Sequence, residues 1–390
     1  MTTRVRSYSK INLGLAIGPM REDGFHALTT LYQTLALHDV VTVSARVLDR
    51  GAASRISLTT NHSRVPVDSR NTCWKMVERV LARLGVAAEV SIYIEKRLPV
   101  QGGMGAGSAN AAAALLGLER ELGVSLGGAE RLRLAGEVGS DVPLFLLGGA
   151  VLGLGRGEMV VPMPDFPRTW CVVAVPEVGV STPQAFRDWD ERQGLGLRDQ
   201  GLGTRAQEPE AGGEPMSQNR DMGHPTQVGL TSAANADRLN ELSLAYASLS
   251  AKTGDGKSGT SGIVRDSNSE KKQGLSGENQ TDAMNDLAEN ALLALVRTGI
   301  GSDGLHNDFE DVVFPQYPSL RIIKRQLMGS DSDSPAIYAA LSGSGSALFG
   351  LYRSEADARA AQRRVQASGV KALVTTTLPR REYWTRMFAE

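Results

Sequence analysis

A glycine-rich segment, PVQGGMGAGSANAAA at 99–113, is the first stretch of the chain that could carry chemistry. Four glycines fall within six of its positions: Gly102, Gly103, Gly105 and Gly107. Glycines allow several backbone N–H groups to converge, and a helix beginning near Ser108 adds the positive end of its dipole. Together these features predict a phosphate-binding loop. The alternative is a tight strand-to-helix turn that binds no ligand.

The loop does not fit either of the common nucleotide-binding motifs. A GxGxxG pattern that starts at Gly103 would need its third glycine where Ser108 stands. Gly102 and Gly107 have the separation of a Walker A loop, but Ser108 and Ala109 replace the Lys–Ser/Thr pair that should follow. The sequence therefore predicts that any cation facing the phosphates comes from outside the loop.

Two lysines and one aspartate have the contexts that such a site needs. Lys10 lies in SYSKINLGLAIG and is expected at the head of an apolar strand, while Lys96 and Arg97 lie in IEKRLP, just before the loop. Asp141 lies in GSDVPLFLLGG, between a glycine turn and an apolar run, so we expect it to be half-buried. A carboxylate there requires a cationic partner, and Lys10 is the candidate. Taken singly, each of these residues is also typical of an ordinary surface charge.

Strands and helices that could position these residues alternate along the first half of the chain. Period-two patterns of β-branched and apolar residues predict strands at 40–47, 55–60 and 89–98. Apolar residues at helical spacing predict a helix at 71–86, with Asn71 as its N-cap, and an Ala/Leu-rich helix at 108–118. Further along we expect a buried strand in WCVVAVP, a strand–glycine turn–strand unit at 338–352 and a helix at 354–368.

Two low-complexity stretches interrupt the second half, at 191–235 and 252–286. They are rich in Gly, Ser, Gln, Asn and Glu and poor in aromatic residues. Such segments cannot bury enough apolar surface to offset the entropy of ordering them, so we expect disorder. We interpret them as surface insertions rather than binding tails. A helical stripe at 236–249 separates them, and ordered structure is expected to resume at 290–300.

Length, charge and cysteine content narrow the class of protein. The chain has 390 residues, which favours two domains. The formal net charge of −1 gives no electrostatic case for binding nucleic acid or an anionic membrane. Cys73 and Cys171 are far apart and show no metal-ligand spacing, which fits a reducing compartment. No targeting signal and no apolar run of about 20 residues is recognised, so we expect a cytoplasmic protein.

Several segments together resemble the GHMP small-molecule kinases. They are SKINLGLAIGPMREDGFHALTTLYQTLALHD (9–39), EKRLPVQGGMGAGSANAAAAL (95–115), GSDVPLFLLGGAVLGLGRGE (139–158), NDFEDVVFPQYP (307–318) and LSGSGSALFG (341–350). The resemblance implies an α+β, two-domain fold. Its N-terminal domain (1–165) would be like domain 2 of ribosomal protein S5. Its C-terminal domain (166–390) would be ferredoxin-like and would carry the insertions.

The resemblance also implies roles for individual residues. The implied catalytic pair is Lys10 and Asp141. Implied nucleotide-binding positions are Asn71, Lys96, Gly102, Gly103, Met104, Gly105, Ala106, Gly107, Ser108 and Asn110. Implied substrate-binding positions are Asn12, Phe25, His26, Phe186, Gly343 and Gly345, with Phe25 at the position of an aromatic that stacks on cytosine. No protein metal ligand is implied.

The sequence departs from the family pattern at three places. Tyr8 and Ser9 precede Lys10 where the family usually has Pro-Ala. Phe25 stands where Tyr is commoner, so the stacking face is kept but the hydroxyl is lost. The motif around Phe186, the second stacking aromatic, is loose.

The implied activity is transfer of a phosphoryl group from ATP, with Mg²⁺, to a small-molecule alcohol. Within the family, the REDGFH segment resembles the branch that phosphorylates a cytidyl diphosphate sugar alcohol in non-mevalonate isoprenoid synthesis. Two alternatives remain: a GHMP kinase of the homoserine or mevalonate type, and a nucleotide-binding sensor on the same fold without turnover. The small-molecule substrate is the only expected partner. The protein itself is expected to be a monomer or a homodimer.

Overall fold

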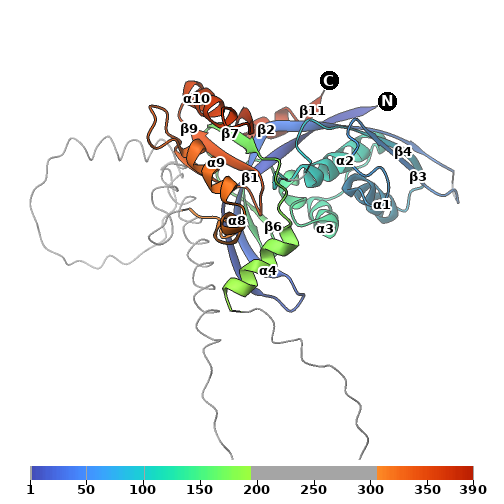
Figure 1. Cartoon of the computed structure of the whole chain (residues 1–390). Coiled ribbons are helices and arrows are strands. Elements are labelled where there is room, and N and C mark those ends of the chain that lie inside the picture. Colours follow the sequence, from blue (N-terminus) through green and yellow to red (C-terminus); the bar gives the residue numbers. More distant parts are fainter. Residues whose placement is uncertain (1, 50, 101, 195–304, 390) are drawn as a thin grey trace, which may run out of the picture.

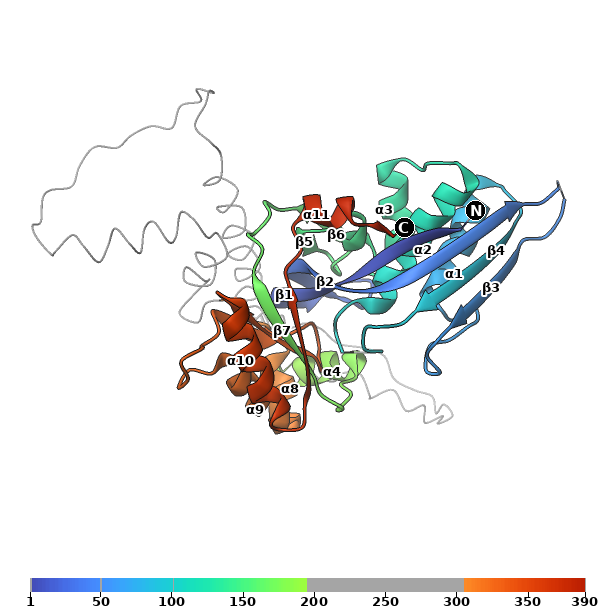
Figure 2. The same ribbon diagram turned by 90° about the horizontal axis from the view of Figure 1, so that it is seen from above.

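Two β-sheets, each covered by helices, organise the part of the chain that the computed structural model describes, residues 2–49, 51–100, 102–194 and 305–389. Figure 1 and Figure 2 show the two sheets next to each other, with helices against each of them. The expected helix at 236–249, the ordered structure expected at 290–300, the stretch 252–286 and residues 195–235 of the other stretch lie outside the described residues. The expectation of disorder from residue 191 is wrong at its start, because Glu191 and Arg192 are the last residues of a helix, α4 (Thr182–Arg192). The mixed α+β, two-sheet architecture confirms the expected fold class.

The first sheet has seven strands and is built on a long antiparallel pair. Its path runs in the order β11-β1-β2-β4-β3, and β5 pairs with both β2 and β6. The strands are β1 (Thr3–Met20), β2 (His26–Val47), β3 (Arg55–Thr60), β4 (Ala88–Glu95), β5 (Ala150–Leu154), β6 (Met159–Pro162) and β11 (Phe388–Ala389). The strands expected at 40–47, 55–60 and 89–98 are confirmed, although the last ends at Glu95. Lys10 was expected at the head of a strand, but β1 begins seven residues earlier and places it mid-strand.

Three helices pack on this sheet and share one apolar core with it. They are α1 (Thr72–Leu84), α2 (Ala106–Leu122) and α3 (Gly128–Val138). Asn71 is the N-cap of α1, as expected: its Oδ1 accepts a hydrogen bond of 2.9 Å from the backbone N–H of Cys73. The small residues of α2 allow close packing, since a Cβ at Gly117 would lie only 2.8 Å from Val43 on β2. Helix α2 begins at Ala106, two residues before the expected Ser108.

The second sheet is antiparallel, with the strand order β10-β7-β9-β8. Its strands are β7 (Trp170–Val175), β8 (Tyr338–Leu341), β9 (Leu348–Tyr352) and β10 (Lys371–Thr376). Helices α9 (Pro318–Met328) and α10 (Glu355–Gln366) cover it, and two further helices, α4 (Thr182–Arg192) and α8 (Glu310–Gln316), lie near its edge. This order is that of a ferredoxin-like sheet, as the resemblance implied. None of the described helices is long and apolar enough to cross a membrane.

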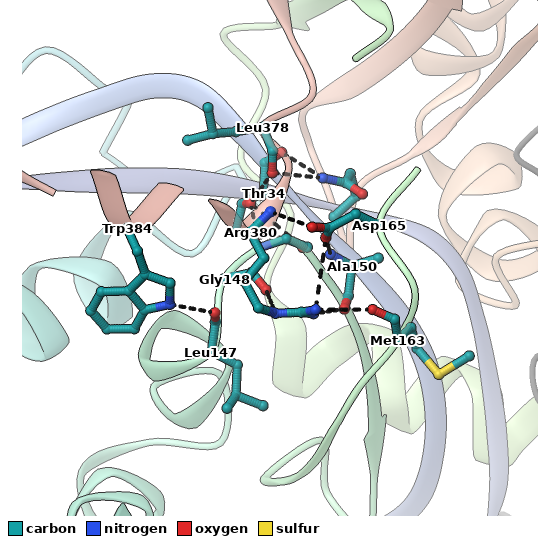
Figure 3. Close-up of polar contacts among 11 residues, drawn as sticks. Thr34, Leu147, Gly148, Ala150, Met163, Asp165, Leu378, Arg380 and Trp384 are labelled. Atoms are coloured by element: carbon teal, nitrogen blue, oxygen red, sulfur yellow. Dashed lines mark hydrogen bonds and ion pairs between the residues drawn. The ribbon is translucent and has the colours of Figure 1, made fainter. Parts of the chain in front are cut away.

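The C-terminal segment returns to the first sheet. Strand β11 pairs with β1, and helix α11 (Arg380–Thr385) places Tyr383 in the core of the N-terminal half. Figure 3 shows how Arg380 fastens this segment: its guanidinium donates to the carbonyl oxygens of Gly148, Ala150 and Met163 at 3.1, 2.6 and 3.1 Å. These bonds fix the chain that connects the 3-10 helix η1 (Pro143–Leu146) to β5. The hydroxyl of Tyr383 donates to the carbonyl of Phe145 at 2.6 Å, so the C-terminal segment also holds η1, which begins two residues after Asp141.

Candidate active site

The glycine-rich loop leads directly into an open helix N-terminus. Gly105, in the left-handed conformation with φ +68°, is the N-cap of α2, and no side chain among the described residues caps this helix. The N–H groups of a first helical turn have no carbonyl partner in their own helix, so they remain available for an anion. Ala106, Gly107 and Ser108 line a cavity of about 370 Å³ at this point. The backbone therefore has the form of the predicted phosphate loop.

Only glycine fits at two positions of the loop. Gly103 has φ +76°, and a Cβ there would lie 2.0 Å from the carbonyl oxygen of Ser342. A Cβ at Gly105 would lie 2.9 Å from the Phe145 ring and 3.0 Å from Cγ of Lys10. The loop thus passes in close contact between the second domain and the lysine of β1.

Backbone and hydroxyl groups from both halves of the molecule hold the loop. The N–H of Lys10 donates to the carbonyl of Met104 at 3.0 Å, and the Ser342 hydroxyl donates to the carbonyl of Gly103 at 3.0 Å. The N–H of Ala347 donates to the carbonyl of Gly102 at 3.2 Å. The glycine turn between β8 and β9 is therefore a direct support of the loop.

Lys10 and Asp141 meet beside the loop, as their contexts predicted. The Nζ of Lys10 lies 3.4 Å from Oδ2 of Asp141 and donates to Oδ1 of Asn12 at 2.6 Å. The lysine side chain is only 3% exposed, whereas the aspartate keeps 32% of its side chain exposed. The cation is thus fixed in place, and the carboxylate faces the cleft.

Tyr32, which the sequence analysis did not single out, completes this cluster. Its hydroxyl donates to Oδ1 of Asp141 at 3.0 Å, and its ring centroid lies 5.5 Å from the Nζ of Lys10. Burial first, and then the negative charge of Asp141, raise the pKa of Tyr32 well above its usual value. Tyr32 is therefore held as a neutral donor that orients the carboxylate.

The smaller cavity is lined by all but one of the residues that the resemblance implied for the nucleotide. Asn71, Lys96 and Asn110 line it together with residues 103–108 of the loop. Gly102 does not line it; its carbonyl is bonded to the N–H of Ala347 instead. The Nζ of Lys96 donates to Oδ2 of the buried Asp39 at 2.5 Å, and the N–H groups of Arg97 and Leu98 donate to Oδ1 of the same carboxylate at 2.8 Å. Asp39, another residue that the sequence analysis missed, positions Lys96 and the turn that follows β4.

A larger cavity, of about 610 Å³, contains the residues implied for the substrate. Asn12, Phe25, His26, Phe186 and Gly343 line it, together with Lys10 and Asp141. The rings of His26 and Phe186 are stacked, with centroids 5.1 Å apart and an interplanar angle of 2°. Phe25, next to His26, is 53% exposed. Along the β1–β2 pair, Tyr32 lies opposite Asn12, whereas His26 lies opposite Met20, six residues away along β2. The aromatic side chains therefore occupy one end of the cavity and the Lys10–Asp141 pair the other.

Gly343 and Gly345, both implied as substrate-binding positions, lie in the glycine turn between β8 and β9. Gly343 has φ +58°, and a Cβ there would approach Oδ1 of Asn12 to 3.5 Å and the Nζ of Lys10 to 3.6 Å. Gly345 lies in the same turn and does not line the larger cavity; a Cβ there would meet the side chain of Leu341. Gly103 lines both cavities, so they meet at the loop, beside Lys10.

The fold and this cleft define a class: two-domain α+β proteins in which two cavities meet at a glycine-rich loop. Family models match two parts of the chain, "GHMP kinases N terminal domain" at residues 71–149 and "GHMP kinases C terminal" at residues 284–371. Among curated proteins, the 4-diphosphocytidyl-2-C-methyl-D-erythritol kinase of Nocardia farcinica is 40% identical over 227 residues, which are 57% of this chain and 69% of that protein. The chain belongs to the GHMP kinase family.

Other relatives carry the same name over shorter stretches. The Nocardioides and Rhodococcus jostii enzymes are 41% and 42% identical, and each match covers 48% of this chain. The chain spans 62% and 58% of their lengths, less than two thirds of either.

Solved structures at lower identity show that the fold is shared. A 4-(cytidine 5'-diphospho)-2C-methyl-D-erythritol kinase matches with a TM-score of 0.57 at 22% identity, covering 96% of this chain and 98% of its own. A homoserine kinase from Cytophaga hutchinsonii has the same TM-score at 18% identity, with 97% and 95% covered. Because kinases with different substrates match equally well, the fold alone does not select a substrate.

Proposed function

We propose that this chain transfers the γ-phosphoryl group of ATP to the 2-hydroxyl of 4-diphosphocytidyl-2-C-methyl-D-erythritol. The observation that carries the proposal is the meeting of two cavities at Gly103, with Lys10 and Asp141 beside the junction. A phosphoryl donor in the smaller cavity and an alcohol in the larger one would place the reacting groups at that junction. The names of the relatives at about 40% identity support the choice of substrate.

The three polar side chains at the junction have complementary roles in the proposed reaction. The 2-hydroxyl is tertiary and a poor nucleophile; Asp141 accepts its proton as the new O–P bond forms and the bond from the γ-phosphorus to the leaving ADP oxygen breaks. The hydroxyl of Tyr32, donating to Oδ1 of Asp141, keeps the carboxylate turned toward the cleft. Lys10, 3.4 Å from Oδ2, stabilises the ionised carboxylate and the charge that develops on the transferred group.

The smaller cavity fits the triphosphate of a nucleotide. Gly103 and Gly105 let the loop pack directly against Ser342, Phe145 and Lys10, where a Cβ would not fit, and the first turn of α2 presents its N–H groups at the cavity. Within the described ranges, no group of three or more His, Cys, Asp or Glu side chains is arranged to hold a metal ion. Mg²⁺ would enter with the nucleotide and would neutralise phosphate charge, and the Ser108 hydroxyl, on the lining of the cavity, would be a protein oxygen available to it.

The larger cavity favours the cytidyl substrate over the smaller substrates of related kinases. A cavity of about 610 Å³ with aromatic side chains at one end suits a ligand with a planar base, whereas homoserine or mevalonate would leave that end unfilled. Phe25 and the stacked pair of His26 and Phe186 supply this end, and we propose that they bind the cytosine. We also propose a reducing cytoplasmic setting, which two buried free cysteines, Cys73 and Cys171, support.

A substrate panel tests the proposal. The purified chain is incubated with ATP and Mg²⁺ and with the cytidyl alcohol, homoserine or mevalonate, and ADP release is followed; phosphorus NMR then locates the new phosphate. We expect turnover with the cytidyl alcohol alone and a product phosphorylated at the 2-hydroxyl. Turnover with homoserine or mevalonate instead would overturn the substrate assignment, and ATP binding without turnover on any of the three would favour a sensor.

A further inference from the structure

Two side chains of α11 bind the carbonyl oxygens at the end of η1. The Tyr383 hydroxyl donates to the carbonyl of Phe145 at 2.6 Å. Trp384 donates from its indole Nε1 to the carbonyl of Leu147 at 2.9 Å, as Figure 3 shows. The last carbonyl groups of a helix have no donor within that helix. The C-terminal segment therefore supplies donors that a helix as short as η1 lacks.

Phe145 connects this contact to both sides of the junction between the cavities. Its N–H donates to the carbonyl of Val142 at 3.2 Å, and Val142 directly follows Asp141. Its ring lies against the glycine-rich loop, where a Cβ at Gly105 would be only 2.9 Å away. The side chain of Phe145 is fully buried, and a close-packed interior transmits a displacement to its neighbours. A shift of the Phe145 peptide would therefore reach both the carboxylate and the loop.

Tyr383 is itself held against β1, the strand that carries Lys10. Its ring fills the space beside Gly148, where a Cβ would collide with it. Its ring centroid lies 5.1 Å from that of Tyr8, one of the residues at which the chain departs from the family pattern. Burial raises the pKa of the Tyr383 hydroxyl, so it stays a neutral donor. The tyrosine thus links η1 to the strand of the lysine.

We propose that Tyr383 and Trp384 are positioning residues for phosphoryl transfer, because they fix where η1 holds Asp141 relative to Lys10 and the loop. The inference rests on the proposed function. Neither side chain lines the smaller or the larger cavity, so their effect should fall on the transfer step and not on ligand binding. A displacement of about 1 Å in a reacting group costs on the order of 10²-fold in rate.

Tyr383→Phe in the full chain tests the inference, because it keeps the ring and removes only the bond to Phe145. The matched control is Tyr352→Phe: Tyr352 is also buried, and its hydroxyl donates to the carbonyl of Leu327 at 2.8 Å, in the second domain. Each variant loses one buried hydrogen bond, so their midpoints of urea unfolding should fall by similar amounts. We expect kcat to fall by about 5- to 30-fold in Tyr383→Phe only, with both KM values within about 2-fold of the wild type.

Two further measurements keep the test decisive if Tyr383→Phe folds poorly. Trp384→Phe removes the donor to Leu147 from an exposed side chain, and kcat should fall by about 3- to 10-fold. Amide hydrogen exchange over residues 142–148 reports on η1 without turnover. Exchange there should be about 10-fold faster in Tyr383→Phe than in Tyr352→Phe.

Two results would overturn the inference and leave the proposed function intact. One is an equal loss of kcat in Tyr383→Phe and Tyr352→Phe, which would mean that any lost buried hydrogen bond has the same effect. The other is a wild-type kcat in both α11 variants. If the wild type does not phosphorylate the cytidyl alcohol, the proposed function is wrong. Exchange then still decides whether α11 holds η1, and equal rates in the two tyrosine variants would overturn that as well.

Discussion

Substituting alanine for Gly103 should disable the site through one backbone contact. The new Cβ would lie 2.0 Å from the carbonyl oxygen of Ser342, while real Cβ contacts are essentially never closer than 3.0 Å, so the loop must move by about 1 Å. A displacement of this size in a reacting group costs on the order of 10²-fold in rate. The positive φ of +76° adds about 1–2 kcal/mol of backbone strain for any residue with a Cβ.

Gly123→Ala is the matched control for this variant. Gly123, at the end of α2, has φ +65°, and nothing lies within 4 Å of the position of its Cβ. Gly123→Ala should therefore lose about 1–2 kcal/mol of unfolding free energy through backbone strain alone, and its kcat/KM should be unchanged. ADP release and urea unfolding are measured for both variants. If Gly103→Ala kept kcat/KM within about 3-fold of the wild type, the claim that this contact fixes the phosphate loop would be refuted.

Two further substitutions test the residues that support the site. Tyr32→Phe removes a hydrogen bond to a charged group, so kcat should fall by about 10- to 100-fold. Because the pKa of Tyr32 is raised well above its usual value of 10.0, the tyrosine stays protonated, and the pH profiles of kcat for variant and wild type should run parallel from pH 6 to 9; an alkaline limb present only in the wild type would contradict this. Asp39→Asn leaves Lys96 buried beside a neutral group and should lower the unfolding free energy in urea by about 3–5 kcal/mol; a loss below about 1 kcal/mol would show that the pair does not hold the turn.

The sequence predicted most of the secondary structure, because periodicity and capping are local signals. Asn71 was recognisable as an N-cap from its position before an apolar helical stripe, and the structure shows the predicted bond. The pairing of Lys10 with Asp141 was also predictable, because a carboxylate in an apolar context requires a cation. The predicted start of β1 was wrong by seven residues. The first residues of this strand include two arginines and contain no apolar run, so they gave no strand signal.

The supporting residues of the site were not predictable in the same way. Tyr32 and Asp141 are 109 residues apart, and only the pairing of β2 with β1 and β5 brings the tyrosine to the carboxylate. Asp39 has no local signal, because its partners follow β4. Contacts of this kind depend on how distant segments of the chain pack together in three dimensions, which local patterns do not specify.

The most direct test of the central claim is single-turnover phosphoryl transfer to the cytidyl alcohol by Asp141→Asn. The substitution keeps the shape of the side chain and its contact with the Tyr32 hydroxyl, but removes the proton acceptor. We predict that ATP and the cytidyl alcohol bind within about 3-fold of their wild-type affinities, and that the transfer rate falls by about 10²- to 10⁴-fold. A transfer rate equal to that of the wild type would contradict the assignment of Asp141 as the group that receives the proton.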